Sequence, residues 1–121
     1  MLRRLFLFSR SVYKPIAVFP RLMPGGAVFS RKETALVSRF ADGSCVVYNV
    51  VDRMAYLLNE TAGVVIELTD GLRSVRIVAE KLCKMYEIDD RRRRRRVTVD
   101  VKRIYRRLNH CGIFSRGGGN R

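Results

Sequence analysis

Apolar residues in the middle of the chain first follow the pattern of short strands. They form three runs rich in β-branched and aromatic residues, at positions 34–40, 45–50 and 55–58. Runs of this length and composition are typical of β-strands. Asp42-Gly43 separates the first two runs and Asp52-Arg53 the last two, and both pairs favour turns. The pattern predicts a three-stranded antiparallel meander.

Downstream of residue 58 the apolar residues recur at helical spacing. Asn59 and Ser74 are good N-cap residues ahead of two such stretches, and Asp70-Gly71 ends the first stretch. A third stripe ends at Gly112, and its members are Val97, Val101, Ile104, Tyr105 and Leu108. Strands occupy one block of sequence and helices the next. This order predicts an α+β fold, with a three-stranded antiparallel sheet followed by three helices.

The two ends of the chain differ from this central block. Residues 1–33 are basic and contain all three prolines of the chain, so we expect a flexible N-terminal extension there. Residues 115–121 include three consecutive glycines, which predicts a flexible Gly/Arg tail. The predicted domain therefore spans residues 34–114. No apolar run approaches the roughly 18–20 residues that a transmembrane helix needs.

Positive charge is concentrated in one short run. The 121 residues have a formal net charge of +14. Residues 34–114 carry sixteen basic and ten acidic residues, and six of the basic ones are the run from Arg91 to Arg96. Arginines at a helix start oppose the helix dipole and repel one another. Either the third helix begins later, near Thr98, or an acidic partner neutralises the run. A solvated arginine segment is the plainer alternative.

Several short segments in order resemble the PqqD-like family over about residues 34–114. They include Leu-Asn-Glu-Thr-Ala at 58–62, the Asp-Gly stop at 70–71, Asp-Val at 100–101 and Gly-Ile-Phe at 112–114. The resemblance implies a winged-helix-like fold. It also implies a non-catalytic protein that captures the leader segment of a ribosomally made precursor peptide. Such proteins present the leader to a modifying enzyme, often a radical-SAM protein, as in pyrroloquinoline quinone biosynthesis.

The resemblance also implies where the peptide binds, between the third strand and the third helix. An extended peptide can add to the edge of a sheet and use side-chain pockets for specificity. The residues at the matching positions are Ala55, Tyr56, Leu57, Leu58, Val101, Ile104, Tyr105 and Leu108. Side chains alternate along a strand, so one pair of the strand residues must face the core. A contact to an acidic leader is expected from Arg91, Arg92, Arg93, Arg94, Arg95 and Arg96.

The sequence lacks the residue combinations that catalysis or cofactor binding requires. His110 and Cys111 are adjacent on a predicted helix and point about 100° apart, which is a poor geometry for a nucleophile and its base. Cys45 and Cys83 are too scattered to form a metal motif with Cys111. We therefore expect no enzyme activity, no metal and no cofactor. Three reduced thiols predict a cytoplasmic protein.

Nucleic-acid binding is the alternative function. The arginine run, together with Arg103, Arg106 and Arg107 on the third helix, could contact phosphates or a groove. The stretch that joins the second and third predicted helices is too long for a tight helix-turn-helix turn. Both functions use the arginine run, and they differ in assigning either the apolar stripe or the basic residues away from it as the rest of the binding surface.

Overall fold

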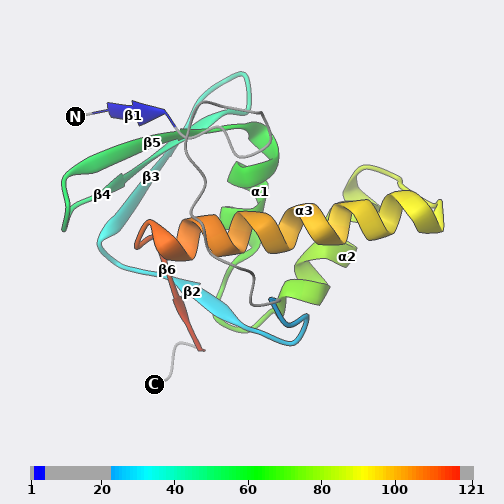
Figure 1. Ribbon diagram of the computed structural model, residues 1–121. Helices are drawn as coiled ribbons and strands as arrows, with labels where there is room; N and C mark the ends of the chain where they lie inside the picture. Colours follow the sequence, from blue (N-terminus) through cyan, green and yellow to red (C-terminus); the bar gives the residue numbers. More distant parts are fainter. Residues whose placement is uncertain (1, 5–22, 118–121) are drawn as a thin grey trace.

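The computed structural model describes residues 2–4 and 23–117 (Figure 1). The elements in chain order are β1 (Leu2–Arg4), β2 (Phe29–Arg31), β3 (Ala35–Arg39), β4 (Cys45–Asn49), β5 (Met54–Leu58), α1 (Glu60–Leu68), α2 (Val75–Met85), α3 (Arg91–His110) and β6 (Phe114–Arg116). The predicted α+β class is confirmed, because an antiparallel β3–β4–β5 sheet precedes three helices.

The meander has the antiparallel strand order and the turns that the sequence predicts. Val37 pairs with Val47 between β3 and β4, and Val47 pairs with Tyr56 between β4 and β5. In the first turn the Asp42 carboxylate accepts a 2.9 Å hydrogen bond from the Ser44 amide, and Gly43 has a φ of 92°. Glycine reaches this conformation without steric cost, so Asp-Gly fixes the turn.

The predicted caps of the first two helices are confirmed. The Asn59 side chain accepts a 2.9 Å hydrogen bond from the Ala62 amide, and the Ser74 hydroxyl accepts one from the Ile77 amide. Each bond satisfies an amide that has no partner within the first turn of its helix. Local sequence therefore determines where these helices begin.

The third helix begins earlier than one of our two expectations allowed. It starts at Arg91 and not near Thr98, so the arginine run is its first two turns. The Asp90 side chain caps it by accepting a 3.0 Å hydrogen bond from the Arg93 amide. This carboxylate also offsets part of the positive charge at the helix start. Capping and the good helix propensity of arginine outweigh the repulsion within the run.

Strands outside the predicted domain extend the packed structure at both ends. β2 pairs antiparallel with β6, Phe29 opposite Arg116, although β2 lies in the predicted extension and β6 reaches the predicted tail. Phe29 is 1% exposed and belongs to the core. The packed structure therefore includes residues on both sides of the segment 34–114. The expected flexibility of residues 5–22 and 118–121 falls outside the described residues.

The core is built from residues of the β3–β5 sheet, the three helices and the β2–β6 ribbon, and α3 is the longest of the helices (Figure 1). The Tyr105 ring stacks on Phe29 with 5.0 Å between centroids and lies 5.2 Å from the ring of Phe114. The Tyr105 hydroxyl and the Thr69 hydroxyl are 2.6 Å apart. This aromatic cluster joins α3, the β2–β6 ribbon and the end of α1.

Candidate functional site

The outer edge of β5 is the first part of the candidate site. β5 pairs with β4 on one side and with β1 on the other, so the four strands have the order β1-β5-β4-β3. The β1–β5 pairing is parallel, with Leu2 opposite Ala55, Arg3 opposite Tyr56 and Arg4 opposite Leu57. The β3–β5 meander therefore presents an edge that accepts an additional strand.

The structure divides the predicted strand residues between two faces. Tyr56 and Leu58 point into the core and are 7% and 2% exposed. Ala55 and Leu57 are half-buried on the opposite face. This division follows from the period of two along a strand. Of the four predicted strand residues, Ala55 and Leu57 are therefore the two whose side chains another molecule could contact.

The predicted helix residues lie in the core. Val101, Ile104, Tyr105 and Leu108 are all essentially fully buried in the stripe that faces the sheet and the β2–β6 ribbon. Burial raises the pKa of the Tyr105 phenol to about 12. These side chains are needed to hold α3 in place, and Val101 also lines a cleft.

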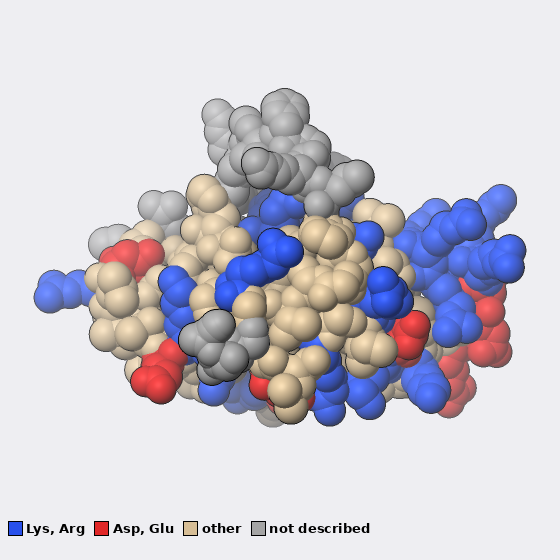
Figure 2. Space-filling view, turned by 90° about the horizontal axis from the view of Figure 1, so that it is seen from below, with Lys and Arg blue, Asp and Glu red and all other residues tan. Residues whose placement is uncertain are grey.

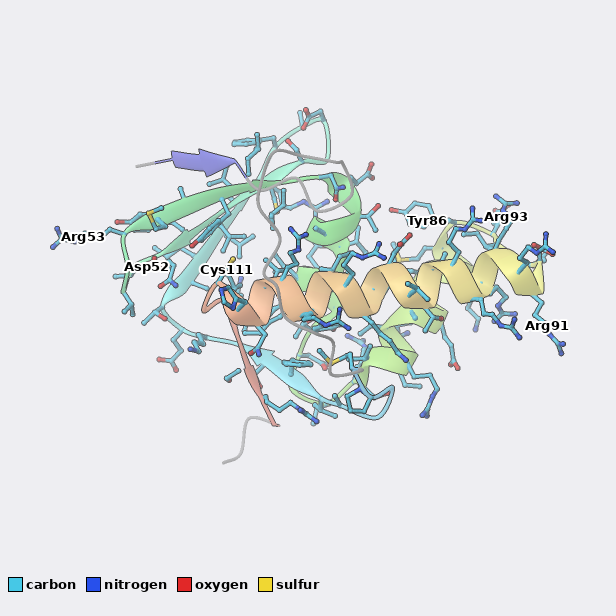
Figure 3. All side chains as sticks on the ribbon, viewed as in Figure 1. Asp52, Arg53, Tyr86, Arg91, Arg93 and Cys111 are labelled. Carbon is cyan, nitrogen blue, oxygen red and sulfur yellow. The ribbon has the colours of Figure 1, made fainter. Side chains whose placement is uncertain are left out.

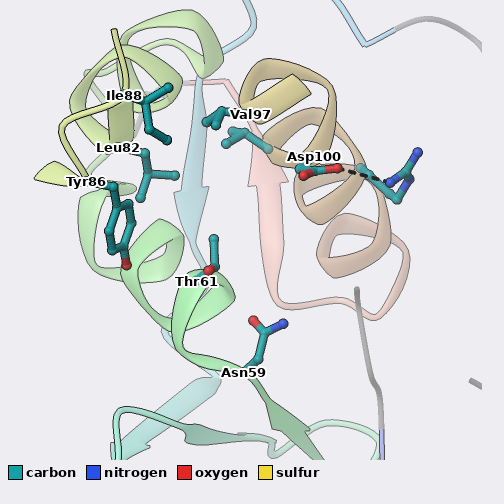
Figure 4. Close-up of a pocket in the computed structure, with 9 residues that line it drawn as sticks. Asn59, Thr61, Leu82, Tyr86, Ile88, Val97 and Asp100 are labelled. Atoms are coloured by element: carbon teal, nitrogen blue, oxygen red, sulfur yellow. Dashed lines mark hydrogen bonds and ion pairs between the residues drawn. The ribbon is translucent and has the colours of Figure 1, made fainter. Parts of the chain in front are cut away.

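That cleft is the second part of the candidate site and opens where β5 ends (Figure 4). It has a volume of about 640 Å³ and lies between the start of α1, the end of α2 and the middle of α3. Its lining residues are Asn59, Thr61, Leu82, Tyr86, Ile88, Val97, Asp100, Val101 and Arg103. Apolar side chains form one wall, and the Asp100–Arg103 ion pair, at 3.2 Å, is on the opposite one.

The loop after α2 brings Ile88 into this cleft. The Ile88 amide donates a 2.8 Å hydrogen bond to the Cys83 carbonyl, and the Glu87 amide donates a 3.2 Å bond to the Lys84 carbonyl. These two bonds form a Schellman motif, which reverses the chain at a helix end. Glu87 has a φ of 55°, in the left-handed region that the motif requires. The turn therefore directs the chain back toward α3.

Sequence reasoning missed most of the cleft residues. Tyr86 and Ile88 follow the end of α2, whereas Val97 belongs to α3, so the three meet only through the packing of α2 against α3. A signal was available in the apolar residues at 86 and 88, which follow the end of the α2 stripe. In the structure Tyr86 is exposed and Ile88 is half-buried. Val97 was assigned to the core stripe, and the structure leaves it half-buried beside the cleft.

The arginine-rich start of α3 is a separate feature of the surface. All six side chains from Arg91 to Arg96 are exposed, and blue atoms gather at this end of the molecule in Figure 2. Figure 3 shows Arg91 and Arg93 at the end of α3 farthest from the β4–β5 turn. Six consecutive helical residues point in all directions around the axis. The positive charge therefore surrounds this helix end.

A shallow depression adjoins the arginine run between α2 and α3. Its volume is about 720 Å³, and it is lined by Arg76, Glu80, Asp89, Arg91, Arg94, Arg95 and Thr98. Within the described part of the chain, the ion pairs are Arg39–Glu67, Arg73–Asp70 and Arg103–Asp100. None of them neutralises an arginine of the run. An anionic group could therefore bind here without displacing an internal partner.

The titratable residues show no catalytic arrangement among the described positions. Cys45, Cys83 and Cys111 are buried cysteines outside any disulfide bond, and burial raises the pKa of the Cys45 thiol. A raised pKa keeps that thiol protonated and unreactive. Residues 2–4 and 23–117 contain no group of three side chains placed to hold a metal ion. In the same part of the chain, no helix has the length and apolar character to cross a bilayer.

Comparison with protein families and solved structures identifies the fold. The family model for coenzyme PQQ synthesis protein D (PqqD) matches residues 44–113. The chain belongs to the PqqD family. The matched PqqD region begins in the β3–β4 turn and ends before β6, so it includes β5, the cleft and the arginine run.

A solved structure has the same fold as this PqqD-family chain. It is that of TbiB1 in complex with the TbiA(beta) leader peptide, with a TM-score of 0.60 and 14% sequence identity. The similarity covers 71% of this chain and 94% of TbiB1. No curated protein matches the sequence.

Proposed function

We propose that this protein is a non-catalytic binding protein for the leader segment of a ribosomally made precursor peptide. The observation that carries the proposal is the β5 edge, which pairs with a further strand in a chain of the PqqD family. The fold shared with TbiB1, which was solved with a leader peptide, supports the same function.

Strand addition explains how such an edge would bind many residues of an extended peptide. The unpaired amides and carbonyls of an edge strand form main-chain hydrogen bonds with the incoming segment. These bonds give affinity with little dependence on sequence. The cleft at the end of β5 would give specificity, because Tyr86, Ile88 and Val97 offer an apolar surface to one or two leader side chains.

The arginine run would add an electrostatic contribution to recognition. We assign it to an acidic segment of the leader or of the modifying enzyme, since the arginines at the depression form no ion pair with any residue that the structure describes. Bound leader would be presented to that enzyme, a radical-SAM protein or another peptide-modifying enzyme. The protein itself would work in the cytoplasm, without cofactor.

The function is tested by titrating the purified chain with a fluorescent leader peptide. The leader is taken from the precursor encoded beside this chain's gene, and a random duplex of 20 base pairs serves as the parallel ligand at physiological salt. We expect sub-micromolar peptide binding and weak duplex binding that falls steeply with salt. Tight duplex binding without peptide binding would support the alternative, a nucleic-acid-binding protein that uses the arginine run.

Replacing one aromatic residue of the cleft tests the location of the site. Tyr86 is half-exposed, so Tyr86→Ala should fold normally and weaken leader binding about tenfold through lost apolar contact. Met85→Ala is the matched control, because Met85 is the neighbouring exposed residue and does not line the cleft. Equal leader affinity of the two variants would exclude the cleft from the binding site.

A further inference from the structure

The β5 edge already has an occupant from the same chain. Residues Leu2–Arg4 form β1 and pair in parallel with residues 55–57 of β5. These are three of the five residues of β5, the strand-binding edge on which the proposed function rests. An edge strand can pair with only one further strand on its outer side. β1 and a leader peptide therefore require the same hydrogen-bonding groups.

We propose that the N-terminal strand β1 is an internal competitor that a leader peptide must displace from β5. This inference rests on the proposed function, because it names the state of that site before the leader binds. Pairing within one chain is independent of protein concentration, and it acts as a high local concentration of a competing strand. Only molecules with a free edge bind the peptide. The apparent association constant is therefore the intrinsic constant multiplied by the fraction of molecules whose edge is free.

The length of β1 makes the displacement feasible. β1 contributes only three residue pairs, whereas β3 and β4 pair over five residues each with their neighbours. A longer peptide strand can pair with the whole of β5 and also reach the cleft that follows Leu58. The edge is therefore protected in the free protein and open to a ligand that makes more contacts than β1 does.

The competition is tested in the full-length chain with a double proline variant, Arg3→Pro/Arg4→Pro. Successive amides of a strand point to opposite sides, so one of these two prolines removes an amide that faces β5. Arg3→Thr/Arg4→Thr is the matched control, since it removes the same two charges and keeps both amides. The first readout is hydrogen exchange of the β5 amides by NMR. We expect alternate amides of β5 to exchange about tenfold faster in the proline variant than in the threonine variant, which corresponds to a strand docked in about nine molecules of ten.

The second readout is the binding of a synthetic peptide of residues 1–10 of this chain, added in solution. It should bind the proline variant about tenfold more tightly than the threonine variant. Equal exchange rates, or equal affinity of the two variants for this peptide, would overturn the inference. Protection that depends on protein concentration would also overturn it, because β1 would then pair with a second copy.

The leader peptide distinguishes this inference from the proposed function. A tenfold gain in leader affinity in the proline variant supports both. The two claims separate if neither variant binds the leader while the proline variant still shows faster exchange and tighter binding of the 1–10 peptide. That result refutes the proposed function and leaves the occupied edge established. Equal leader affinity with faster exchange refutes the competition.

Discussion

Tyr105 shows at the scale of one residue why a predicted site residue belongs to the core. Its ring stacks on Phe29, and its hydroxyl lies 2.6 Å from the Thr69 hydroxyl. The Thr69 hydroxyl donates its single hydrogen to the Val65 carbonyl at 2.6 Å, so the Tyr105 hydroxyl is the donor between the two. A charged residue at this position would disrupt the fold before it could report on peptide binding.

The buried phenol predicts a loss of stability at alkaline pH. Burial raises the pKa of Tyr105 from 10 to about 12, whereas in the unfolded chain the pKa stays near 10. The stabilising contribution is therefore complete below pH 10 and is lost as the pH rises to about 12. We expect about 2–3 kcal/mol of the free energy of unfolding to depend on this residue across that range.

Tyr105→Phe is the variant that isolates this effect. At pH 7 it should cost only about 1 kcal/mol, because Thr69 keeps its hydrogen bond to Val65. Between pH 10 and 12 the variant should lose less stability than the parent chain. Urea unfolding at a series of pH values measures the difference, and parallel curves for the two proteins would show that the phenol has the same pKa in the folded and unfolded states.

At the scale of an element, the helices α2 and α3 end in the same motif with different residues. α3 has Gly112 at the left-handed position, with a φ of 80°, and the Ile113 amide donates to the Leu108 carbonyl. α2 has Glu87 at the corresponding position. A side chain in the left-handed conformation costs about 1 kcal/mol or more relative to glycine. The α2 end is therefore strained where the α3 end is relaxed.

Glu87→Gly should consequently stabilise the protein by about 1 kcal/mol. The expected result is a higher midpoint of urea unfolding, with unchanged leader affinity because Ile88 keeps its place in the cleft. Gly112→Ala is the opposite control. The alanine Cβ would lie 2.8 Å from the side-chain amide nitrogen (Nδ2) of Asn49. A φ of 80° is also unfavourable for alanine, so this variant should be destabilised. A Glu87→Gly protein of lower stability would show that the carboxylate makes a compensating contact.

At the scale of the whole molecule, positive charge is uneven, and its longest consecutive run lies at the start of α3. The chain has a net charge of +14, and the start of α3 presents six exposed arginines around one helix end. Attraction between exposed charges weakens with ionic strength. Any contribution of this end to leader binding must therefore depend on salt.

Replacing Arg91, Arg94 and Arg95 by glutamine tests this contribution. With an acidic leader we expect about tenfold weaker binding at low salt and a shallower dependence of affinity on salt, since each exposed pair contributes a few tenths of a kcal/mol or more. The matched control replaces Arg31, Lys32 and Arg53 by glutamine. These residues are exposed elsewhere on the surface, and their replacement removes the same charge. Equal losses in the two triple variants would assign the effect to net charge, and no loss in either would leave the run as a solvated helix end.

The same triple variant also separates the two candidate functions at this scale. The weak binding of the duplex of 20 base pairs should be lost when these three arginines are replaced, because affinity for phosphates depends directly on the number of cations that contact them. Leader binding should keep the part that comes from β5 and the cleft.

Sequence alone determined the strands β3–β5, the three helices and the starts of α1 and α2. Strand and helix periods, the Asp-Gly turn and the caps Asn59 and Ser74 depend on contacts within a few residues, and each prediction from them is confirmed. For the start of α3 the sequence allows two interpretations, because capping favours an early start of the helix and charge repulsion within the arginine run opposes it.

Tertiary structure decided which of these residues can form a site. The order of apolar residues does not reveal that Tyr56 and Leu58 face the core, nor that Tyr86, Ile88 and Val97 meet at one cleft. It likewise gives no sign that Leu2–Arg4 pairs with β5 or that Phe29 completes the aromatic cluster. Each of these depends on segments far apart in the chain, and their contacts form only when the whole core packs.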